Sequence, residues 1–289
     1  MKLSIIINAD DFGLTKDTNI AVEELVQIGT LTSTSVMVNM PYAAEIISLL
    51  KYEKLGIGLH FNLTQGKPIL DTQTIPSLVN NNGCFYNIME FKKRAKKGLI
   101  KIEDVLKELI AQYNILAQWV GVRLTHIDSH QDINKLSLIS RALCVFAGDL
   151  NKKIGLRIYN KCYIVDDRKF KILHPSINTI FIFGIKRSII ETIFRRRRSK
   201  LSSYFNLTDG MLFAMNNNVR TLLNLLPKIS FSEKYKDMIL EIMCHPATST
   251  NELKETKMLT SRVEEYEILK SVYFQNVKEK FNLINFSNL

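Results

Sequence analysis

The sequence predicts an α/β fold of the (β/α)-barrel class, and two observations support this prediction. Short runs rich in apolar and β-branched residues alternate with stretches of helical periodicity, which is typical of parallel strands joined by helices. Carboxylate and imidazole side chains directly follow several of the predicted strands. Because the carboxyl ends of parallel strands meet at one face of a barrel, these side chains are expected to form one active site.

The first half of the chain shows the clearest alternation. Its first strand is the apolar run at 3–8, and the helix that follows is expected to stop at Gly29, a residue type common at helix ends. Pro41 is expected to open the second helix, because proline is tolerated in a first turn. Strands are expected at 3–8, 31–39, 56–63, 123–128, 156–159 and 238–244, and helices at 18–28, 41–50, 103–119, 136–148 and 261–274.

The stretch from 161 to 226 is the least regular and most basic part of the sequence. It is expected to be an insertion or a lid over the site, since connecting segments often carry such functions. No repeat, low-complexity tract or linker interrupts the sequence, so residues 1–289 are expected to form a single domain.

Composition narrows the class of protein. Hydrophobic residues make up 46% and charged residues 23% of the 289 residues, which excludes disorder as the default and allows a large core. The four cysteines show no CxxC spacing and are expected to be buried thiols in a reducing compartment. The amino terminus does not have the pattern of a signal peptide, and no apolar stretch is long enough to span a bilayer. The expected location is therefore the cytoplasm.

The net charge of +11 indicates an acidic partner. The densest basic block consists of four arginines: Arg195, Arg196, Arg197 and Arg198. Two interpretations of this block stay open, which are peripheral contact with an anionic membrane and a solvated helix face. Nucleic acid is not expected as a partner, because the sequence has no recognised binding module or basic-aromatic platform. A homodimer is compatible with the sequence.

An aspartate pair, Asp10 and Asp11, follows the first predicted strand. Adjacent residues on an extended chain point in opposite directions, so one carboxylate can bind a metal while the other acts as a general base. A turn or a helix cap is the alternative, because Asp-rich turns are common. His60 ends the third strand and is followed by Asn62 and Thr64. This pattern fits a metal-bound imidazole with polar neighbours as well as it fits a core histidine.

Candidate residues also occur later in the chain. His126, Asp128 and His130 have a spacing of two, which puts them on one face if the strand continues. His126 would then bind a metal and Asp128 would orient an imidazole, whereas a solvent-exposed sheet edge is the alternative. His245 precedes a proline and is expected to be either a general acid or a loop histidine. Arg157 is expected to pair with a catalytic carboxylate or the substrate, or else to form a surface ion pair.

Together these segments strongly resemble the YdjC-like carbohydrate deacetylase family. The resembling segments are 8–13, 32–39, 58–64, 125–131 and 244–246, followed by Arg262, Glu265 and Tyr266. They run in order over nearly the whole chain, which is more specific than any single motif. The resemblance implies an irregular (β/α)-barrel of the polysaccharide-deacetylase type. It also implies a hydrolase that removes the N-acetyl group from an N-acetylated sugar, either an oligosaccharide or a glycolipid, and releases acetate.

The same resemblance implies roles for individual residues. One divalent metal ion, Mg or Zn, would be held by Asp11, His60 and His126. Asp10 would be the catalytic base, and His245 or His130 would protonate the leaving amine.

Two positions depart from the family pattern. Asp132 and Asn134 stand where family members commonly carry histidines, which puts the specificity or the activity in question. More weakly, the basic stretch 181–200 resembles relatives associated with hopanoid biosynthesis, which implies a membrane-lipid-linked sugar. One open alternative is another metal-dependent hydrolase acting on phosphoesters, which the positive charge favours but which needs more ligands for a two-metal site. A non-catalytic protein that binds sugar or a lipid surface on the same scaffold is the second alternative.

Overall fold

The computed structural model describes residues 3–158, 162–166, 171–176, 196–214, 222, 237–253 and 259–289. These residues contain a ten-stranded sheet with the order β5-β4-β3-β2-β1-β9-β8-β6-β7, and β10 pairs with β1. The strands are β1 (Ser4–Phe12), β2 (Ser33–Val36), β3 (Gly56–Phe61), β4 (Leu124–Ser129), β5 (Gly155–Leu156), β6 (Cys162–Asp166), β7 (Lys171–Ser176), β8 (Gly210–Ala214), β9 (Ile239–Cys244) and β10 (Asn282–Leu283). The α-helices are α1 (Lys16–Gln27), α2 (Ile88–Lys96), α3 (Ile102–Val120), α4 (Ser137–Gly148), α7 (Leu259–Lys270) and α8 (Val272–Lys278). The 3-10 helices are η1 (Ala43–Lys51), η2 (Thr72–Thr74), η3 (Gly121–Arg123), η4 (His130–Lys135) and η7 (Phe286–Asn288).

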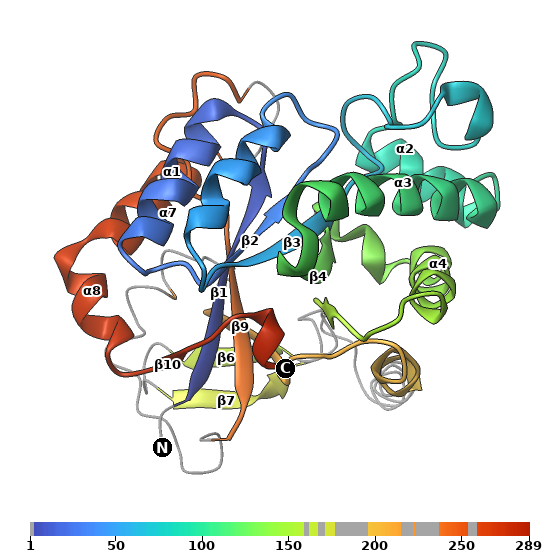
Figure 1. The fold of residues 1–289 in the computed structure, drawn as a ribbon. Coiled ribbons are helices and arrows are strands. Elements are labelled where there is room, and N and C mark those ends of the chain that lie inside the picture. Colours follow the sequence, from blue (N-terminus) through green and yellow to red (C-terminus); the bar gives the residue numbers. More distant parts are fainter. Residues whose placement is uncertain are drawn as a thin grey trace.

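The sheet is parallel at every described pairing except that of β6 with β7. Figure 1 shows the sheet curling, because β6 and β7 run across the view while β1 and β9 run along it. Helices α1, α7 and α8 lie on one side of the strands, and α2, α3 and α4 lie on the other (Figure 1). This curled parallel sheet with helices outside confirms the expected irregular (β/α)-barrel.

The strands that carry the polar side chains are buried on both faces. In β1 Ile5, Ile6 and Ile7 are fully buried, as are Ile57 and Leu59 in β3. Such continuous apolar runs are typical of parallel strands covered by helices. The side chains at the carboxyl ends of these strands are therefore fixed to a closely packed base.

Most predicted elements lie near their expected positions, and local hydrogen bonds explain several of their bounds. Helix α1 begins after Thr15, whose hydroxyl accepts a hydrogen bond from the Thr18 N–H and caps the helix. The single helix expected at 261–274 is two helices, α7 and α8. Ser271 lies between them, and its hydroxyl oxygen accepts from the Phe274 N–H at the start of α8.

Three stretches differ from the prediction. The helix expected at 41–50 is the 3-10 helix η1, and α2 lies where the sequence predicts no element. The described part of 161–226 includes β6, β7 and β8, which continue the sheet beyond β9, so this part belongs to the barrel wall. Their short apolar runs are bounded by charged residues and give a weak strand signal. The stretch 177–195, which includes most of the hopanoid-associated segment and Arg195, lies outside the described residues.

Cys84, Cys144 and Cys244 are free thiols; Cys144 and Cys244 are buried as expected, whereas Cys84 is only half-buried. Within the described residues, no helix combines the length and the apolar character needed to cross a bilayer.

Candidate metal centre and active site

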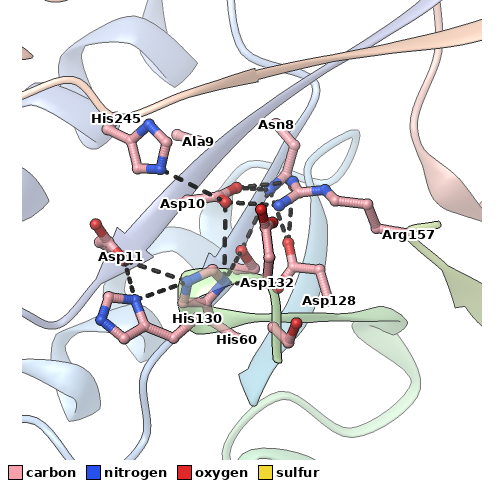
Figure 2. A network of polar contacts seen from close by, with 12 residues as sticks. Asn8, Ala9, Asp10, Asp11, His60, Asp128, His130, Asp132, Arg157 and His245 are labelled. Carbon is pink, nitrogen blue, oxygen red and sulfur yellow. Dashed lines mark hydrogen bonds and ion pairs between the residues drawn. The ribbon is translucent and has the colours of Figure 1, made fainter. Parts of the chain in front are cut away.

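Polar side chains gather at the carboxyl ends of β1, β3, β4 and β9 (Figure 2). The side chains brought together there are Asp10, Asp11, His60, Asp128, His130 and His245. All of them except His245 are buried. The structure thus assembles most of the residues that the sequence placed at strand ends, and it does so at one face of the barrel.

The chain does not stay extended through the aspartate pair. Asp11 has a φ of 65°, in the left-handed region that Asp tolerates better than most residues. The pairing of β1 with β2 shifts register between Ala9 and Phe12, as expected for a bulge. Both carboxylates therefore approach His60: Asp10 Oδ2 lies 4.0 Å from its Nδ1, and Asp11 Oδ1 lies 3.2 Å from its Nε2. Strand alternation did not predict this shared neighbour.

Three ligand-type atoms converge on one point beside Asp11. Asp11 Oδ1 lies 3.2 Å from His60 Nε2 and 3.0 Å from His130 Nδ1, and the two ring nitrogens are 3.3 Å apart. On the far side of each ring an acceptor takes the ring proton. Asp128 Oδ1 lies 2.7 Å from His60 Nδ1, and Gln65 Oε1 lies 2.9 Å from His130 Nε2. The two converging nitrogens consequently present lone pairs to the common point.

This donor set fits a divalent metal ion. One carboxylate oxygen and two imidazole nitrogens are common ligands, and bonds of about 2.0–2.1 Å at tetrahedral to right angles put ligand atoms about 2.8–3.4 Å apart. When both rings are neutral, three lone pairs this close repel one another unless a cation lies between them; without a metal, a proton on His60 takes that place. Asp11, His60 and His130 therefore form the candidate metal centre.

A second group could also hold a metal by distance alone: Asp10, His60 and Asp128. Its carboxylates are already engaged by a cation. The Arg157 guanidinium donates to both oxygens of Asp10, at 2.6 and 2.7 Å, and lies 3.0 Å from Asp128 Oδ2. Arg157 occupies both oxygens of Asp10, whereas Arg262 engages only Oδ2 of Asp11 and leaves Oδ1 facing the two imidazoles, so the first group is the better site.

Electrostatics also favours a cation beside Asp11. Burial alone would raise the pKa of the Asp11 carboxyl, but the charges of Arg262 and His130 hold that pKa well below its usual range. Burial would lower the pKa of His60, but the surrounding carboxylates, first of all Asp128, raise it to about 10. The surroundings thus keep the Asp11 carboxyl ionised and stabilise positive charge on the His60 ring.

Arg157 is an interior residue, not part of a surface ion pair. It is fully buried in the barrel, and its Nε donates to Glu241 Oε1 at 2.5 Å. Asp10, which it clamps, also lies 3.8 Å from His245 Nε2 (Figure 2). Burial lowers the pKa of His245, although the charges of Asp11 and Asp10 act in the opposite direction. Asp10 therefore lies between the candidate metal centre and a histidine that holds its proton weakly.

His126 lies elsewhere, and the expected grouping of His126 with Asp11 and His60 is not the one that the structure shows. Its Nδ1 lies 2.9 Å from Thr125 Oγ1, its Nε2 lies 3.1 Å from Asn8 Oδ1, and its ring is fully buried. A strand rises about 3.3 Å per residue, so His126 lies about 6.6 Å deeper in the barrel than Asp128. His130, which follows the end of β4, takes the position that the prediction gave to His126.

Several residues of the site had no predicted role. Glu241 is a fully buried carboxylate within an apolar strand, β9, and that pattern alone indicates a buried partner. Arg262 Nη2 lies 2.5 Å from Asp11 Oδ2, although the position of Arg262 in the sequence suggested no partner. Gln65 follows β3 in a loop, and no pattern singles it out.

The two departures from the family pattern lie next to this network. Gln131 and Asp132 have φ values of 52° and 59°, so the chain turns sharply after His130. Asp132 Oδ2 accepts from the Lys135 ammonium group at 2.6 Å. Asn134 donates through its amide to the carbonyl oxygen of Arg157 at 2.9 Å, so it supports the backbone that carries the guanidinium.

Two of the three described arginines of the block make interior contacts, whereas Arg196 is exposed. Arg197 is half-buried and donates to the carbonyl oxygens of Lys135 and Asn134. Arg198 is also half-buried and donates to the carbonyl oxygen of Thr208 at 2.8 Å. These two guanidinium groups therefore tie the helix at 196–202 to the barrel, and neither has the exposure of a residue on a fully solvated face.

The chain is similar to known proteins over nearly its whole length. The family described as YdjC-like protein matches residues 4–280. A carbohydrate deacetylase from Geobacillus stearothermophilus is 41% identical over 131 residues, which cover 45% of this chain and half, 50%, of that relative. A carbohydrate deacetylase from Xenopus laevis is 26% identical over 298 residues, covering 95% of this chain and 94% of the relative. A crystal structure from Enterococcus faecalis, provisionally named a cellobiose-phosphate cleavage protein, superposes with a TM-score of 0.74 at 25% identity and covers 100% of this chain and 99% of that one.

Proposed function

The chain belongs to the YdjC-like protein family, and on this premise we propose that it is a metal-dependent hydrolase that removes the N-acetyl group from an N-acetylated sugar. The observation that carries the proposal is the convergence of Asp11, His60 and His130 beside the clamped carboxylate of Asp10. Two relatives named carbohydrate deacetylase support the reaction type.

The metal ligands in this proposal are Asp11, His60 and His130. Two imidazoles and one carboxylate leave positions open for water and substrate, as a catalytic site requires. Nitrogen ligands favour Zn or another transition ion over Mg. A bound ion would supply a water whose pKa is lowered from 15.7 towards about 7, and it would polarise the acetyl carbonyl.

Asp10 is the general base in this proposal. Arg157 holds both of its oxygens, so the carboxylate stays in one orientation beside His60. From there Asp10 accepts the proton of the attacking water. Glu241 engages the Nε of Arg157 and thereby fixes the clamp from behind.

His245 is the general acid. Its Nε2 lies 3.8 Å from Asp10 Oδ2, so both proton-transfer groups reach the same small volume. Because burial lowers the pKa of His245, its protonated form gives a proton readily to the leaving amine. The products are acetate and an amino sugar.

Acetate release tests the proposal directly. The purified protein is incubated with free, oligomeric, phosphorylated and lipid-linked N-acetyl sugars, and the metal content of the same sample is measured. The provisional name of the Enterococcus faecalis neighbour is the reason to include phosphorylated disaccharides. We expect acetate and free amine in equal amounts, loss of both on chelation, and recovery when one metal ion per chain is restored. Release of phosphate without acetate would instead favour the phosphoester alternative.

A further inference from the structure

A buried histidine that the proposed chemistry leaves unused contacts the catalytic base through one intermediate. Figure 2 shows Asn8 beside Asp10. The Asn8 side chain is in turn hydrogen-bonded to His126. We propose that His126 is a positioning residue, which orients the Asn8 amide and through it the Asp10 carboxylate. The inference rests on the proposed function, because it assigns a role within the same site.

The Asn8 amide is useful to the site in only one orientation. Its Nδ2 lies 2.8 Å from Asp10 Oδ1, 3.2 Å from Ser35 Oγ and 3.4 Å from Asp128 Oδ2. If the amide were rotated by half a turn, its oxygen would face two carboxylates at these distances. Unfavourable contacts between negative oxygens in a buried site are costly. The orientation of Asn8 therefore decides whether Asp10 Oδ1 is held or repelled.

His126 selects that orientation. Asn8 Oδ1 can only accept a hydrogen bond, so the His126 Nε2 at 3.1 Å must donate its proton. The other nitrogen, Nδ1, then accepts from the Thr125 hydroxyl at 2.9 Å, which is shorter than the 3.2 Å from the same hydroxyl to the Ile57 carbonyl oxygen. Burial lowers the pKa of His126 to about 3, so the ring stays neutral and keeps this single tautomer.

The ring itself is clamped between two glycines and an aromatic ring. A Cβ atom on Gly58 would lie 2.3 Å from His126 Nε2, and one on Gly155 would lie 3.0 Å from His126 Cβ. The opposite face stacks on Phe286, with ring centroids 3.8 Å apart and an interplanar angle of 14°. Phe286 follows β10, which pairs with β1, the strand that carries Asn8. Packing this close leaves the imidazole one position and directs its Nε2 at Asn8.

A matched pair of variants tests the role. His126→Leu fills the space without a donor, whereas the amide nitrogen of His126→Gln replaces the Nε2 donor. We expect His126→Leu to lower kcat about 10- to 100-fold, the usual effect of losing an outer hydrogen bond, with KM and metal affinity within about twofold of wild type. His126→Gln should recover most of the lost kcat. Leu116→Ala is the control for core damage, because Leu116 is buried in α3 away from the network; this variant should melt earlier and keep its kcat.

Two outcomes would overturn the inference. Loss of metal in proportion to loss of activity in His126→Leu would make His126 a ligand, and unchanged kcat in that variant would make it only a packing residue. If His126→Leu does not fold, Thr125→Val decides, because it keeps the ring and removes the hydroxyl that contacts His126 Nδ1 and the Ile57 carbonyl oxygen; full activity of Thr125→Val would then contradict the inference. Failure of the wild-type protein to release acetate would contradict the proposed function instead, and the metal affinities of the variants would still report whether His126 is a ligand.

Discussion

Arg157 and Asp10 form a bidentate ion pair, in which the terminal guanidinium nitrogens lie 2.6 and 2.7 Å from the two carboxylate oxygens. Both side chains are buried, so water screens little of their attraction. A bidentate pair of this kind neutralises the two charges and also fixes the orientation of the carboxylate relative to the guanidinium. The ion pair fixes the orientation of Asp10 as the proposed base. The neighbouring Asp11 has a different proposed role, because its Oδ1 faces His60 Nε2 and His130 Nδ1.

Asp10→Asn should abolish most of the rate and keep the metal. The amide has nearly the same shape and still accepts one hydrogen bond from Arg157, but it does not take up a proton. We expect kcat to fall about 100- to 10,000-fold, the usual contribution of a general base. Acetate release and metal content are measured on the same sample. An inactive variant that has also lost its metal would contradict separate roles for Asp10 and Asp11.

His130→Ala should abolish metal binding, whereas Gln65→Ala should only weaken metal binding. Gln65 fixes the tautomer of the His130 ring through a 2.9 Å contact and does not reach the metal point, so its loss should cost about 10- to 100-fold in affinity. Loss of the ligand itself should cost more. Equilibrium dialysis against a metal buffer measures both constants. Equal affinities in the two variants would remove His130 from the proposed ligand set.

Arg157→Met should destabilise the protein, because it leaves the carboxylates of Asp10, Asp128 and Glu241 without their cation. Removing one partner of a buried ion pair typically costs about 3–5 kcal/mol of unfolding free energy. Glu241→Gln is the matched control: the amide oxygen still accepts from Arg157 Nε, so the loss should be about 1 kcal/mol or less. Urea unfolding followed by circular dichroism gives both values. Similar losses in the two variants would argue that the Arg157 charge does not stabilise the carboxylates.

His245→Asn should slow the enzyme according to the leaving group. An amine leaves only after protonation, so acetate release from an N-acetyl sugar should fall about 100- to 10,000-fold. A nitrophenolate leaves without a proton, so hydrolysis of 4-nitrophenyl acetate should stay close to the wild-type rate. Both substrates are assayed with one preparation of each protein. The same loss on both would place the role of His245 before bond cleavage.

Glu265 should make stability depend on pH in the metal-stripped protein. Burial raises the pKa of this carboxyl from 4.5 to about 7, against the opposing effects of the His245 N–H and the Arg262 charge. Folding thus favours the neutral acid. Its contribution to the unfolding free energy is complete below about pH 4.5 and is lost as the pH rises through about 7. The full loss is about 3 kcal/mol.

Glu265→Gln stays neutral throughout and provides the comparison. The unfolding free energy of the wild type minus that of Glu265→Gln should therefore fall between about pH 4.5 and 7 and stay level above that. Urea titrations at a series of pH values, with a chelator present, measure this difference. A difference that stayed constant over that interval would show that Glu265 ionises equally in the folded and unfolded chains.

The sequence predicted the place of the site better than its inner arrangement. Asp10, His60 and His245 directly end or follow apolar runs, and strand ends of parallel sheets meet, so their proximity was predictable. How deep each histidine lies within the barrel was not predictable. His126 and His130 share one face by alternation, and only the stagger of β4 against its neighbours decides which of them reaches the mouth.

Backbone conformation and tertiary contacts account for the other differences. The left-handed turn at Asp11 follows from its surroundings, since most residues in a strand are extended. Arg197 and Arg198 belong to a run of like charges, and such runs are usually solvated. Their bonds to carbonyl oxygens of distant residues depend on how the helix at 196–202 packs, which no local pattern specifies.

The stacking of Phe286 on His126 has a consequence for biosynthesis. All three proposed ligands, Asp11, His60 and His130, are translated within the first half of the chain, so a nascent polypeptide still attached to the ribosome already contains every atom that contacts the ion. The aromatic ring that backs His126 belongs to Phe286 and is translated more than 150 residues later. The atoms that would hold the ion and the ring that keeps the base aimed therefore come from segments far apart in the sequence, so a variant that lacks only the aromatic ring of Phe286 should still load metal and turn over slowly.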